Sequence, residues 1–360
     1  MDTYNADVDK KVVKSSTEIS KTRIPWIEKF RPMNMGEIIS HETIIASLQR
    51  FIDTKSLPHL LFFGPSGSGK TSTIMCCARA IYNEYTEFMI MKLNASNERG
   101  IETVRTKIKN FVASKNNMFI PMKVRNSFKL VILDEIDSMT VEAQNVLRQI
   151  IEKNSVTTRF CLICNDIDKI NVALQSRCTL YRFSPLKPEF MIIKLKKITK
   201  IEKIIATEEA IDAIVLISKG DMRSAINTLQ YAALTAGSMN NSERNQPNND
   251  KIITLDLIYK ISGYSAPEIN KGNFKLLMKL YQKKITLQEC VEKLATIISE
   301  HNITLFNLLS ELKKSVMAHK LTTDQKIFLI DNFAKCETYD SLNIEPRIIL
   351  MNVASLFVLL

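Results

Sequence analysis

The chain has 360 residues, a formal net charge of +11 and seven scattered cysteines. Its length predicts about two or three domains, and the absence of any run of about 18 apolar residues excludes a transmembrane helix. The charged and polar residues 1–22 predict a disordered tail rather than a signal peptide, so we expect an intracellular protein with reduced thiols.

Five short apolar segments predict the strands of a buried parallel sheet, at 59–63, 88–93, 129–133, 159–164 and 180–183. Helical patterns occupy most of the gaps, at 71–82, 101–112 and 141–152, the last behind a Thr140 cap. Alternation of strands and helices predicts an α/β domain at 23–184. The pattern is then helical at 185–236 and 254–360, and the polar residues 237–253 predict a flexible linker.

A glycine-rich loop lies between the first predicted strand and the first predicted helix. Its residues are Gly64, Pro65, Ser66, Gly67, Ser68, Gly69, Lys70 and Thr71, and Ser72 comes next in the chain. They follow the pattern G-x-x-x-x-G-K-S/T, in which backbone N–H groups of the loop and of the helix N-terminus bind phosphates. Lys70 would supply a positive charge and Thr71 a hydroxyl ligand for Mg²⁺, so the loop predicts a nucleoside triphosphate site.

Polar side chains end two later strands of the predicted sheet. Asp134 and Glu135 follow the third strand, and Asn165 follows the fourth. Ligands bind beyond the carboxyl ends of strands in open α/β sheets, so we expect these side chains to meet at one site. There Asp134 would orient the water shell of Mg²⁺, Glu135 would activate the attacking water, and Asn165 would hold that water or contact the γ-phosphate.

Two arginines are further candidates. Arg177, in the segment Ser176-Arg177-Cys178, has the features of an arginine finger, although the sequence leaves open whose phosphate it contacts. Arg223 lies in the first turn of a helix for which Asp221 is the predicted N-cap. A cation there opposes the helix dipole, so Arg223 either points at a bound anion or is exposed to solvent.

Three further patterns have competing interpretations. Residues 105–129 carry seven basic side chains and no acidic one, which indicates either contact with a polyanion or an ordinary solvated surface. The lysine-rich run at 194–203 indicates either a solvated helix face, which the pattern favours, or a binding site. Cys161 and Cys164 have the spacing of half a zinc site, but their apolar neighbours favour buried core cysteines.

Taken together, these motifs resemble the small subunits of replication factor C, the sliding-clamp loader of eukaryotes and archaea within the AAA+ ATPases. The resemblance runs from Trp26 to about residue 236 and depends on the segments WIEKFRP, LPHLLFFGPSGSGKTS, LNASNERGI, FKLVILDEID, TRFCLICN, ALQSRC and SKGDMRSAINTLQ. It implies an AAA+ parallel-sheet P-loop ATPase domain, then a small helical lid domain at 185–236 and an all-α collar domain at 254–360 that serves oligomerisation.

The resemblance also implies roles for the residues that match each motif. Lys70 and Thr71 match the Walker A motif, Asp134 and Glu135 match the Walker B motif, and Asn165 matches sensor 1. These correspondences imply binding of ATP with Mg²⁺, in which Thr71 and Asp134 hold the metal, and they imply hydrolysis of the bound ATP.

Further roles follow from the same resemblance. Arg223 matches sensor 2, and Arg177 matches the arginine that reaches into the ATP site of a neighbouring subunit. The region around Arg31 and Ile39 corresponds to the part that lines the adenine pocket.

The resemblance places Arg99 and Arg105 in a segment that faces duplex DNA. The basic window continues along the same predicted helix, so Lys107 and Lys109 become DNA-binding candidates too. Residues near 112–125 resemble the part that meets the sliding clamp.

The resemblance therefore implies a clamp-loader ATPase. Its expected partners are other replication factor C subunits in a hetero-oligomeric pentamer, a ring-shaped sliding clamp and primer–template DNA, without a membrane. It is expected in the nucleus, or at the replication site of a large DNA virus. Two alternatives remain open at this point: a structural subunit of such a complex that binds ATP with little turnover, and a different AAA+ DNA motor.

Overall fold

A computed structural model describes residues 24–54, 56–96, 101–114, 128–239, 252–342 and 344–360. The chain forms two compact units. The first runs to Ile198 and includes Ser218–Asn227, and the second includes Thr199–Ile217 and Thr228–Leu360. This division crosses residues 185–236, and the domain boundaries drawn from the sequence stay predictions.

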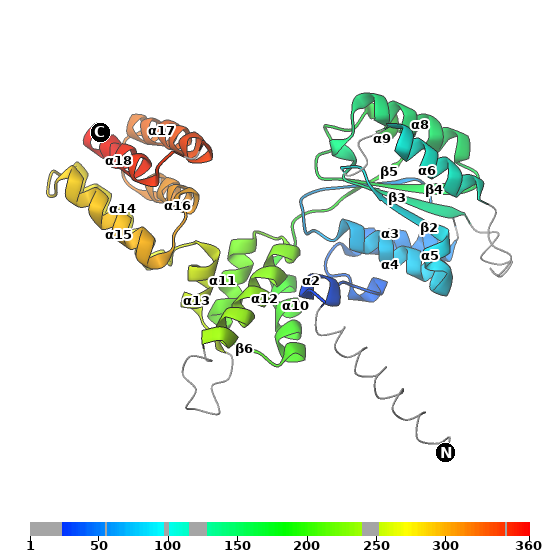
Figure 1. Cartoon of the computed structure of the whole chain (residues 1–360), viewed down its shortest axis with the longest axis horizontal. Helices are drawn as coiled ribbons and strands as arrows, with labels where there is room; N and C mark the ends of the chain where they lie inside the picture. The colour runs from blue at the N-terminus through cyan, green and yellow to red at the C-terminus, as the bar shows by residue number, and fades with distance from the viewer. Residues whose placement is uncertain (1–23, 55, 97–100, 115–127, 240–251, 343) are drawn as a thin grey trace, which may run out of the picture. The chain divides into compact units, whose positions relative to one another are not determined.

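The first unit is built on a five-stranded parallel sheet (Figure 1). Its strands are β1 Leu60–Phe63, β2 Ile90–Asn94, β3 Lys129–Asp134, β4 Thr158–Cys164 and β5 Thr179–Arg182. They lie in the order β2-β3-β4-β1-β5, so β1 pairs with β4 on one side and with β5 on the other. The predicted parallel α/β sheet is confirmed, and the glycine-rich loop leaves it from an interior strand.

Helices cover both faces of this sheet (Figure 1). They are α3 Glu42–Asp53 and α4 Lys70–Tyr82 on one face, and α6 Ile101–Ala113 and α8 Val141–Asn154 on the other. Alternation along β1 fills both cores, because successive side chains of a strand point to opposite faces. Leu60 and Phe62 pack with Ile74 of α4, whereas Leu61 packs in the cluster that contains Leu147 of α8.

The short elements of the first unit are α2 Trp26–Lys29, η1 Met35–Glu37, η2 Asn83–Tyr85, α5 Thr86–Met89, η3 Ile136–Ser138 and α9 Val172–Gln175. Two longer helices extend across the boundary between the units, α10 Pro188–Glu202 and α12 Met222–Met239. The predicted strand at 88–93 began too early, since Phe88 lies in α5 and is 56% exposed. Helical turns continue to Met89, so the chain becomes extended only at Ile90.

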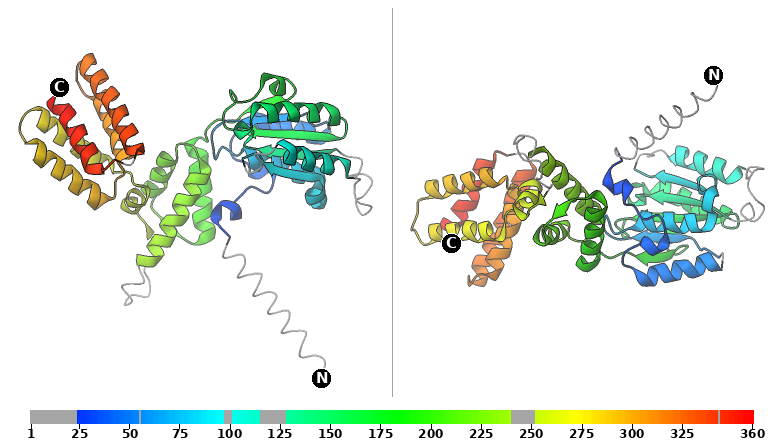
Figure 2. Two further views of the ribbon diagram at one scale, coloured as in Figure 1. Left: turned by 45° about the horizontal axis from the view of Figure 1, so that its top comes forward. Right: turned by 90° about the horizontal axis from the view of Figure 1, so that it is seen from below.

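The second unit is mainly helical, and its part from residue 252 onward is coloured yellow to red in Figure 2. Its elements are β6 Ile205–Ala206, α11 Glu208–Ser218, β7 Ile252–Ile253, α13 Leu255–Ser262, α14 Pro267–Tyr281, α15 Leu287–His301, α16 Leu305–Ala318, α17 Thr323–Ser341 and α18 Pro346–Val358. Buried residues that include Leu277, Leu309 and Phe357 join α14–α18 in one core. The prediction that residues 254–360 are helical is confirmed.

The predicted linker at 237–253 was too long at both ends. Helix α12 continues to Met239, and Ile252–Ile253 forms a parallel pair with Ile205–Ala206. The β-branched isoleucines suit a strand, and their pairing partner lies far upstream in the sequence. Residues 240–251 lie outside the described part of the chain, as does the predicted tail at 1–22. Among the described helices, none has the length and apolar character needed to cross a membrane.

Candidate nucleotide-binding site

A cavity of about 350 Å³ lies in the first unit, beside the glycine-rich loop. Its lining includes most of the residues predicted from the sequence, namely Arg31, Ile39, Ser66, Gly67, Ser68, Gly69, Lys70, Thr71, Ser72, Asp134, Glu135, Asn165 and Arg223. The loop, the ends of β3 and β4 and the first turn of α12 supply most of the polar part of this lining. The structure therefore brings these side chains together around one cavity.

The glycines of the loop permit close approaches that a side chain would block. Gly64 and Gly67 have φ angles of 141° and 63°, in the region that favours glycine. A Cβ atom on Gly64 would overlap the carbonyl oxygen of Phe183, and one on Gly67 would overlap the Asp221 carboxylate. The loop thus depends on glycine both for its backbone conformation and for its packing.

Lys70 is held at the base of the loop and is only 7% exposed. Its Nζ donates hydrogen bonds to the carbonyl oxygens of Gly64 and Pro65, at 2.7 and 2.8 Å, and to Oδ1 of Asn165 at 3.1 Å. Burial lowers the pKa of Lys70, and the Asp134 carboxylate opposes that shift. A cation fixed in this way inside the cavity is suited to a phosphate ligand.

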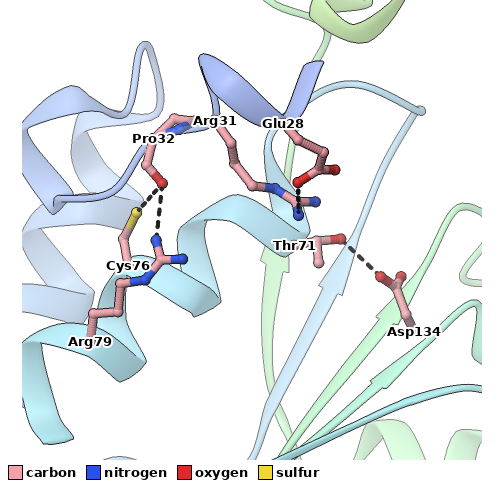
Figure 3. A network of polar contacts seen from close by, with 7 residues as sticks. All are labelled: Glu28, Arg31, Pro32, Thr71, Cys76, Arg79 and Asp134. Carbon is pink, nitrogen blue, oxygen red and sulfur yellow. Dashed lines mark hydrogen bonds and ion pairs between the residues drawn. The ribbon is translucent and has the colours of Figure 1, made fainter. Parts of the chain in front are cut away.

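Thr71 and Asp134 form the oxygen-rich part of the site (Figure 3). The Thr71 hydroxyl donates to Oδ2 of Asp134 over 3.0 Å, which joins the first turn of α4 to the end of β3. Hydroxyl and carboxylate oxygens are ligands that Mg²⁺ accepts, together with phosphate oxygens. The residues present therefore fit the magnesium and nucleotide ligands expected from the sequence.

The backbone conformation of Glu135 and a hydrogen bond to the backbone of Asn165 position these two side chains. Glu135 adopts a left-handed conformation with φ of 58°, which ends β3 and brings its side chain to the cavity lining. Oδ2 of Asp137 accepts hydrogen bonds from the backbone N–H of Asn165 at 3.2 Å and of Asp166 at 3.4 Å. Asp137, to which the sequence analysis gave no role, therefore fixes the loop that carries Asn165.

Asp221 connects the first turn of α12 to the glycine-rich loop. Its Oδ2 accepts from the Ser66 hydroxyl at 2.7 Å, and its Oδ1 accepts from the backbone N–H groups of Arg223 and Ser224 at 2.8 and 3.1 Å. The predicted N-cap is confirmed, and its bond to Ser66 is a further contact that the sequence did not reveal. The Arg223 side chain is exposed and lines the cavity.

The segment before α3 supplies the apolar side of the cavity. Ile39 and Arg31 both line it, and Arg31 forms an ion pair with Glu28 at 3.0 Å. The carbonyl oxygen of Pro32 accepts from Sγ of Cys76 at 3.3 Å and from the Arg79 guanidinium at 3.4 Å (Figure 3). These two contacts with α4 hold the segment against the helix that begins at Lys70.

Arg177 does not belong to the cavity lining. Its guanidinium forms an ion pair with Glu152 of α8 and donates to the carbonyl oxygen of Ala173 over 2.8 Å. Both partners belong to the same chain as Arg177. The structure thus leaves this arginine outside its own nucleotide site, and its predicted action on a neighbour stays a prediction.

The DNA-binding candidates lie on or near α6. Lys107 and Lys109 are exposed on this helix. Arg99 lies outside the described residues, and so does the side chain of Arg105. The segment 112–125 lies partly outside them as well, beyond Ser114.

Lys129 corrects the interpretation of the basic window. It is 7% exposed, and its ammonium donates to the carbonyl oxygens of Phe111 and Ser114, at the C-terminus of α6. Its Nζ also lies 5.0 Å from the centre of the Phe111 ring. One of the seven charges therefore stabilises the end of a helix inside the protein and is not available to a polyanion.

Cys161 and Cys164 are buried in β4, as expected for core cysteines. In the part of the chain that the structure describes, no group of three or more histidine, cysteine or acidic side chains could hold a metal ion.

Lys194 of α10 also lines the cavity, although the sequence favoured a solvated face over a binding site for its lysine-rich run. The spacing of Lys194 from apolar residues of the same helix could have indicated this position. Lys194 follows the buried Met191 by three residues and precedes the buried Ile198 by four, so it shares their side of the helix.

Comparison with known proteins agrees with a nucleotide site, because it finds an ATPase family. Residues 60–186 match the family model described as ATPase family associated with various cellular activities (AAA). The solved structure of a RuvB Holliday junction branch migration motor from Thermotoga maritima is similar, with a TM-score of 0.50 over 88% of this chain and 99% of that one. At 14% identity this similarity concerns the fold alone.

The curated relatives are closer. The chain is 59% identical over 347 residues to a protein of Acanthamoeba polyphaga mimivirus named replication factor C small subunit L499, covering 96% of this chain and 97% of that protein. It is 37% identical over 338 residues to human replication factor C subunit 5, covering 93% and 91% of the two chains. A replication factor C small subunit of Methanococcus vannielii is 34% identical, over 87% of this chain and 91% of its own length. The chain therefore belongs to the replication factor C small-subunit family of AAA ATPases.

Proposed function

We propose that this chain is an ATP-hydrolysing subunit of a sliding-clamp loader, which binds primer–template DNA and helps to open and load a ring-shaped clamp during DNA replication. The observation that carries the proposal is the arrangement of Lys70, Thr71, Asp134 and Glu135 around one cavity. The identity of 59% to a replication factor C small subunit supports clamp loading over the other activities of AAA ATPases.

ATP with Mg²⁺ is the proposed substrate. The Lys70 ammonium donates to two loop carbonyls and can exchange one of these hydrogen bonds for a phosphate oxygen. The Thr71 hydroxyl and the Asp134 carboxylate would hold Mg²⁺, which neutralises phosphate charge when it is bound. Ile38 and Ile39 offer an apolar surface for the adenine ring.

In the proposed hydrolysis, a water oxygen forms a bond to the γ-phosphorus, and the bond from that phosphorus to ADP breaks. The water proton passes to Glu135, which lines the cavity beside Asp134. Asn165 would orient the water, because its amide lies in the cavity lining and its Oδ1 is anchored by Lys70. Arg223 would add positive charge near the γ-phosphate, and Arg177 would act on the nucleotide of a neighbouring subunit.

We further propose that the chain assembles with other replication factor C subunits into a hetero-oligomeric pentamer. Arg99, Arg105, Lys107 and Lys109 would contact DNA phosphates without reading the base sequence, as basic side chains do. Hydrolysis would then release the clamp and the DNA. The proposed place of action is the site of DNA replication, in a nucleus or in a cell infected by a large DNA virus, and the mimivirus relative supports the second setting.

The test is ATP turnover by this chain assembled with its sibling subunits, measured with and without primer–template DNA and the sliding clamp. Strong stimulation by DNA and clamp together is expected. Turnover that responds to DNA and ignores the clamp would favour a different AAA+ motor. If Glu135→Gln leaves the total turnover of the complex unchanged, the chain is a structural subunit that binds ATP without using it.

A further inference from the structure

Lys194 is a half-buried cation on the wall of the nucleotide cavity. It lies on α10, next to the buried Leu195 and on the same side as Met191 and Ile198. Partial burial of an ammonium group is unfavourable unless an anion or a set of acceptors compensates it. No ion pair among the described residues involves Lys194.

The other cations of the cavity lining differ from Lys194 in this respect. Arg31 is paired with Glu28, and the Lys70 ammonium donates to three oxygen atoms. Among the described residues, Arg223 and Lys194 are the lining cations whose side chains have neither an ion pair nor a hydrogen bond. Lys194 belongs to α10 and Arg223 to α12, the helices that follow the sheet in the chain.

Lys194 and Arg223 serve different parts of the cavity. Arg223 acts electrostatically on Lys70, the residue at the phosphate end. Burial lowers the pKa of Lys194, and the nearby Lys197 lowers it further. The carboxylate of Glu37, which directly precedes the lining residues Ile38 and Ile39, opposes this shift. The Lys194 ammonium therefore lies toward the apolar end, where the nucleoside would sit.

We infer that Lys194 binds the nucleotide at its nucleoside end, through an oxygen of the α-phosphate or the ribose, and not through the γ-phosphate. This inference depends on the proposed use of the cavity for ATP. It gives α10 a direct part in binding both the substrate and the product of hydrolysis. An ammonium group with three N–H donors and a flexible stem suits such oxygen acceptors.

The experiment measures dissociation constants of MgATP and MgADP by calorimetry on the full-length chain. Lys194→Met keeps the aliphatic stem that packs in the cavity wall and removes the charge. Loss of a charge-assisted hydrogen bond is expected to raise both constants about tenfold, by the same factor for ATP and ADP. Lys194→Arg should restore most of the affinity.

The matched control is Lys200→Met, an exposed lysine less than two turns away on the same helix, which should bind both nucleotides like the wild type. Thermal unfolding without nucleotide shows that the variants are folded. The inference is overturned if Lys194→Met binds both nucleotides normally, or if it loses ATP but keeps ADP. If the wild-type chain binds neither nucleotide, the proposed function itself fails, which separates the two results.

Discussion

The Asp221 carboxylate accepts a hydrogen bond from the Ser66 hydroxyl over 2.7 Å, although 155 residues separate them in the sequence. The same carboxylate caps α12 through the backbone of Arg223. One side chain thus fixes the glycine-rich loop against the helix that carries Arg223.

We predict that Ser66 and Asp221 are energetically coupled. In a double-mutant cycle with Ser66→Ala and Asp221→Ala, the coupling should be about 0.5–1.5 kcal/mol in the free energy of unfolding, the net worth of one hydrogen bond. Asp221→Ala alone should cost about 1 kcal/mol more, because α12 also loses its N-cap. Urea denaturation measures each value.

The control cycle pairs Ser66→Ala with Asp168→Ala, an exposed carboxylate that has no hydrogen bond to Ser66. Its effects should add. Additive effects for Ser66 and Asp221 would mean that their contact contributes nothing to stability.

Glu135→Gln should separate nucleotide binding from hydrolysis. The amide has the size of the carboxylate but cannot take up a proton, so turnover at this site should fall about 10²- to 10⁴-fold. Binding of MgATP should stay within a few-fold of the wild type, since the glycine-rich loop and Lys70 are unchanged. Glu142→Gln, on the exposed face of α8, is the matched control and should leave both quantities unchanged. A variant that neither binds nor hydrolyses ATP would contradict this division of roles.

Arg177 and its partner Glu152 should differ greatly in their effect on the assembled complex. An arginine finger contributes about 10³- to 10⁵-fold, so Arg177→Ala should reduce hydrolysis at the neighbouring site by a comparable factor. Arg177→Lys should not rescue it, since lysine lacks the planar fork of donors. Glu152→Gln should change turnover less than about fivefold, because an exposed ion pair is worth at most about 1 kcal/mol. Single-site turnover in complexes with one competent ATP site gives both numbers.

Arg50→Ala, an exposed arginine on α3, controls for the loss of a surface charge. Unchanged turnover in Arg177→Ala would remove Arg177 from the catalytic machinery.

Stability should fall as the pH drops from about 6.5 to about 4, in part because of His59. Burial, and then the nearby Arg159 guanidinium, lower the pKa of His59 from 6.5 to about 4. The neutral ring accepts a hydrogen bond from the backbone N–H of Phe160 at Nδ1, over 3.2 Å. Between these two pKa values the unfolded state binds the extra proton, so the free energy of unfolding decreases as the pH decreases, and above pH 6.5 His59 adds no pH dependence.

The measurement is the melting temperature of the wild type and of His59→Asn between pH 7.5 and 4.5. Asparagine can accept the same hydrogen bond but does not titrate, so the difference between the two proteins should change only below about pH 6.5. Parallel curves over the whole range would show that the pKa of His59 is the same in the folded and unfolded states.

The exposed Lys109 tests the DNA surface. If it contacts a phosphate, Lys109→Ala should reduce the magnitude of the slope of log affinity against log salt by about 0.9, without changing sequence preference. Lys320→Ala, an exposed lysine outside α6, should leave the slope unchanged. Equal slopes for the wild type and Lys109→Ala would exclude this contact. Fluorescence anisotropy of labelled primer–template DNA with the assembled complex measures the slopes.

The sequence alone was sufficient to predict the features that depend on short-range patterns. Apolar strands followed by Asp134 and by Asn165 predicted both the sheet and the place where these side chains meet, because parallel strands bring their carboxyl ends to one edge. Helix starts were equally accessible, since Thr140 and Asp221 are caps that bond to N–H groups within three residues. The fold of the first unit follows from such short-range signals.

Long-range pairing is what the sequence could not show. Lys129 counts as a surface charge until its ammonium is seen to cap α6. The contact between Ser66 and Asp221 joins segments with no shared pattern. The sequence of one chain could not show the contact of Arg177 either, because its predicted target belongs to a different subunit.

The late position of Asp221 and Arg223 has a consequence for biosynthesis. All five strands of the sheet are complete once Arg182 has been translated. The cavity is not, because Met222, Arg223 and Ile226 of its lining are added about 40 residues later, after a stretch that belongs to the second unit. A nascent chain at the ribosome, with translation at roughly 5–20 residues per second, passes through a state lasting seconds in which the sheet can form but its nucleotide site cannot close.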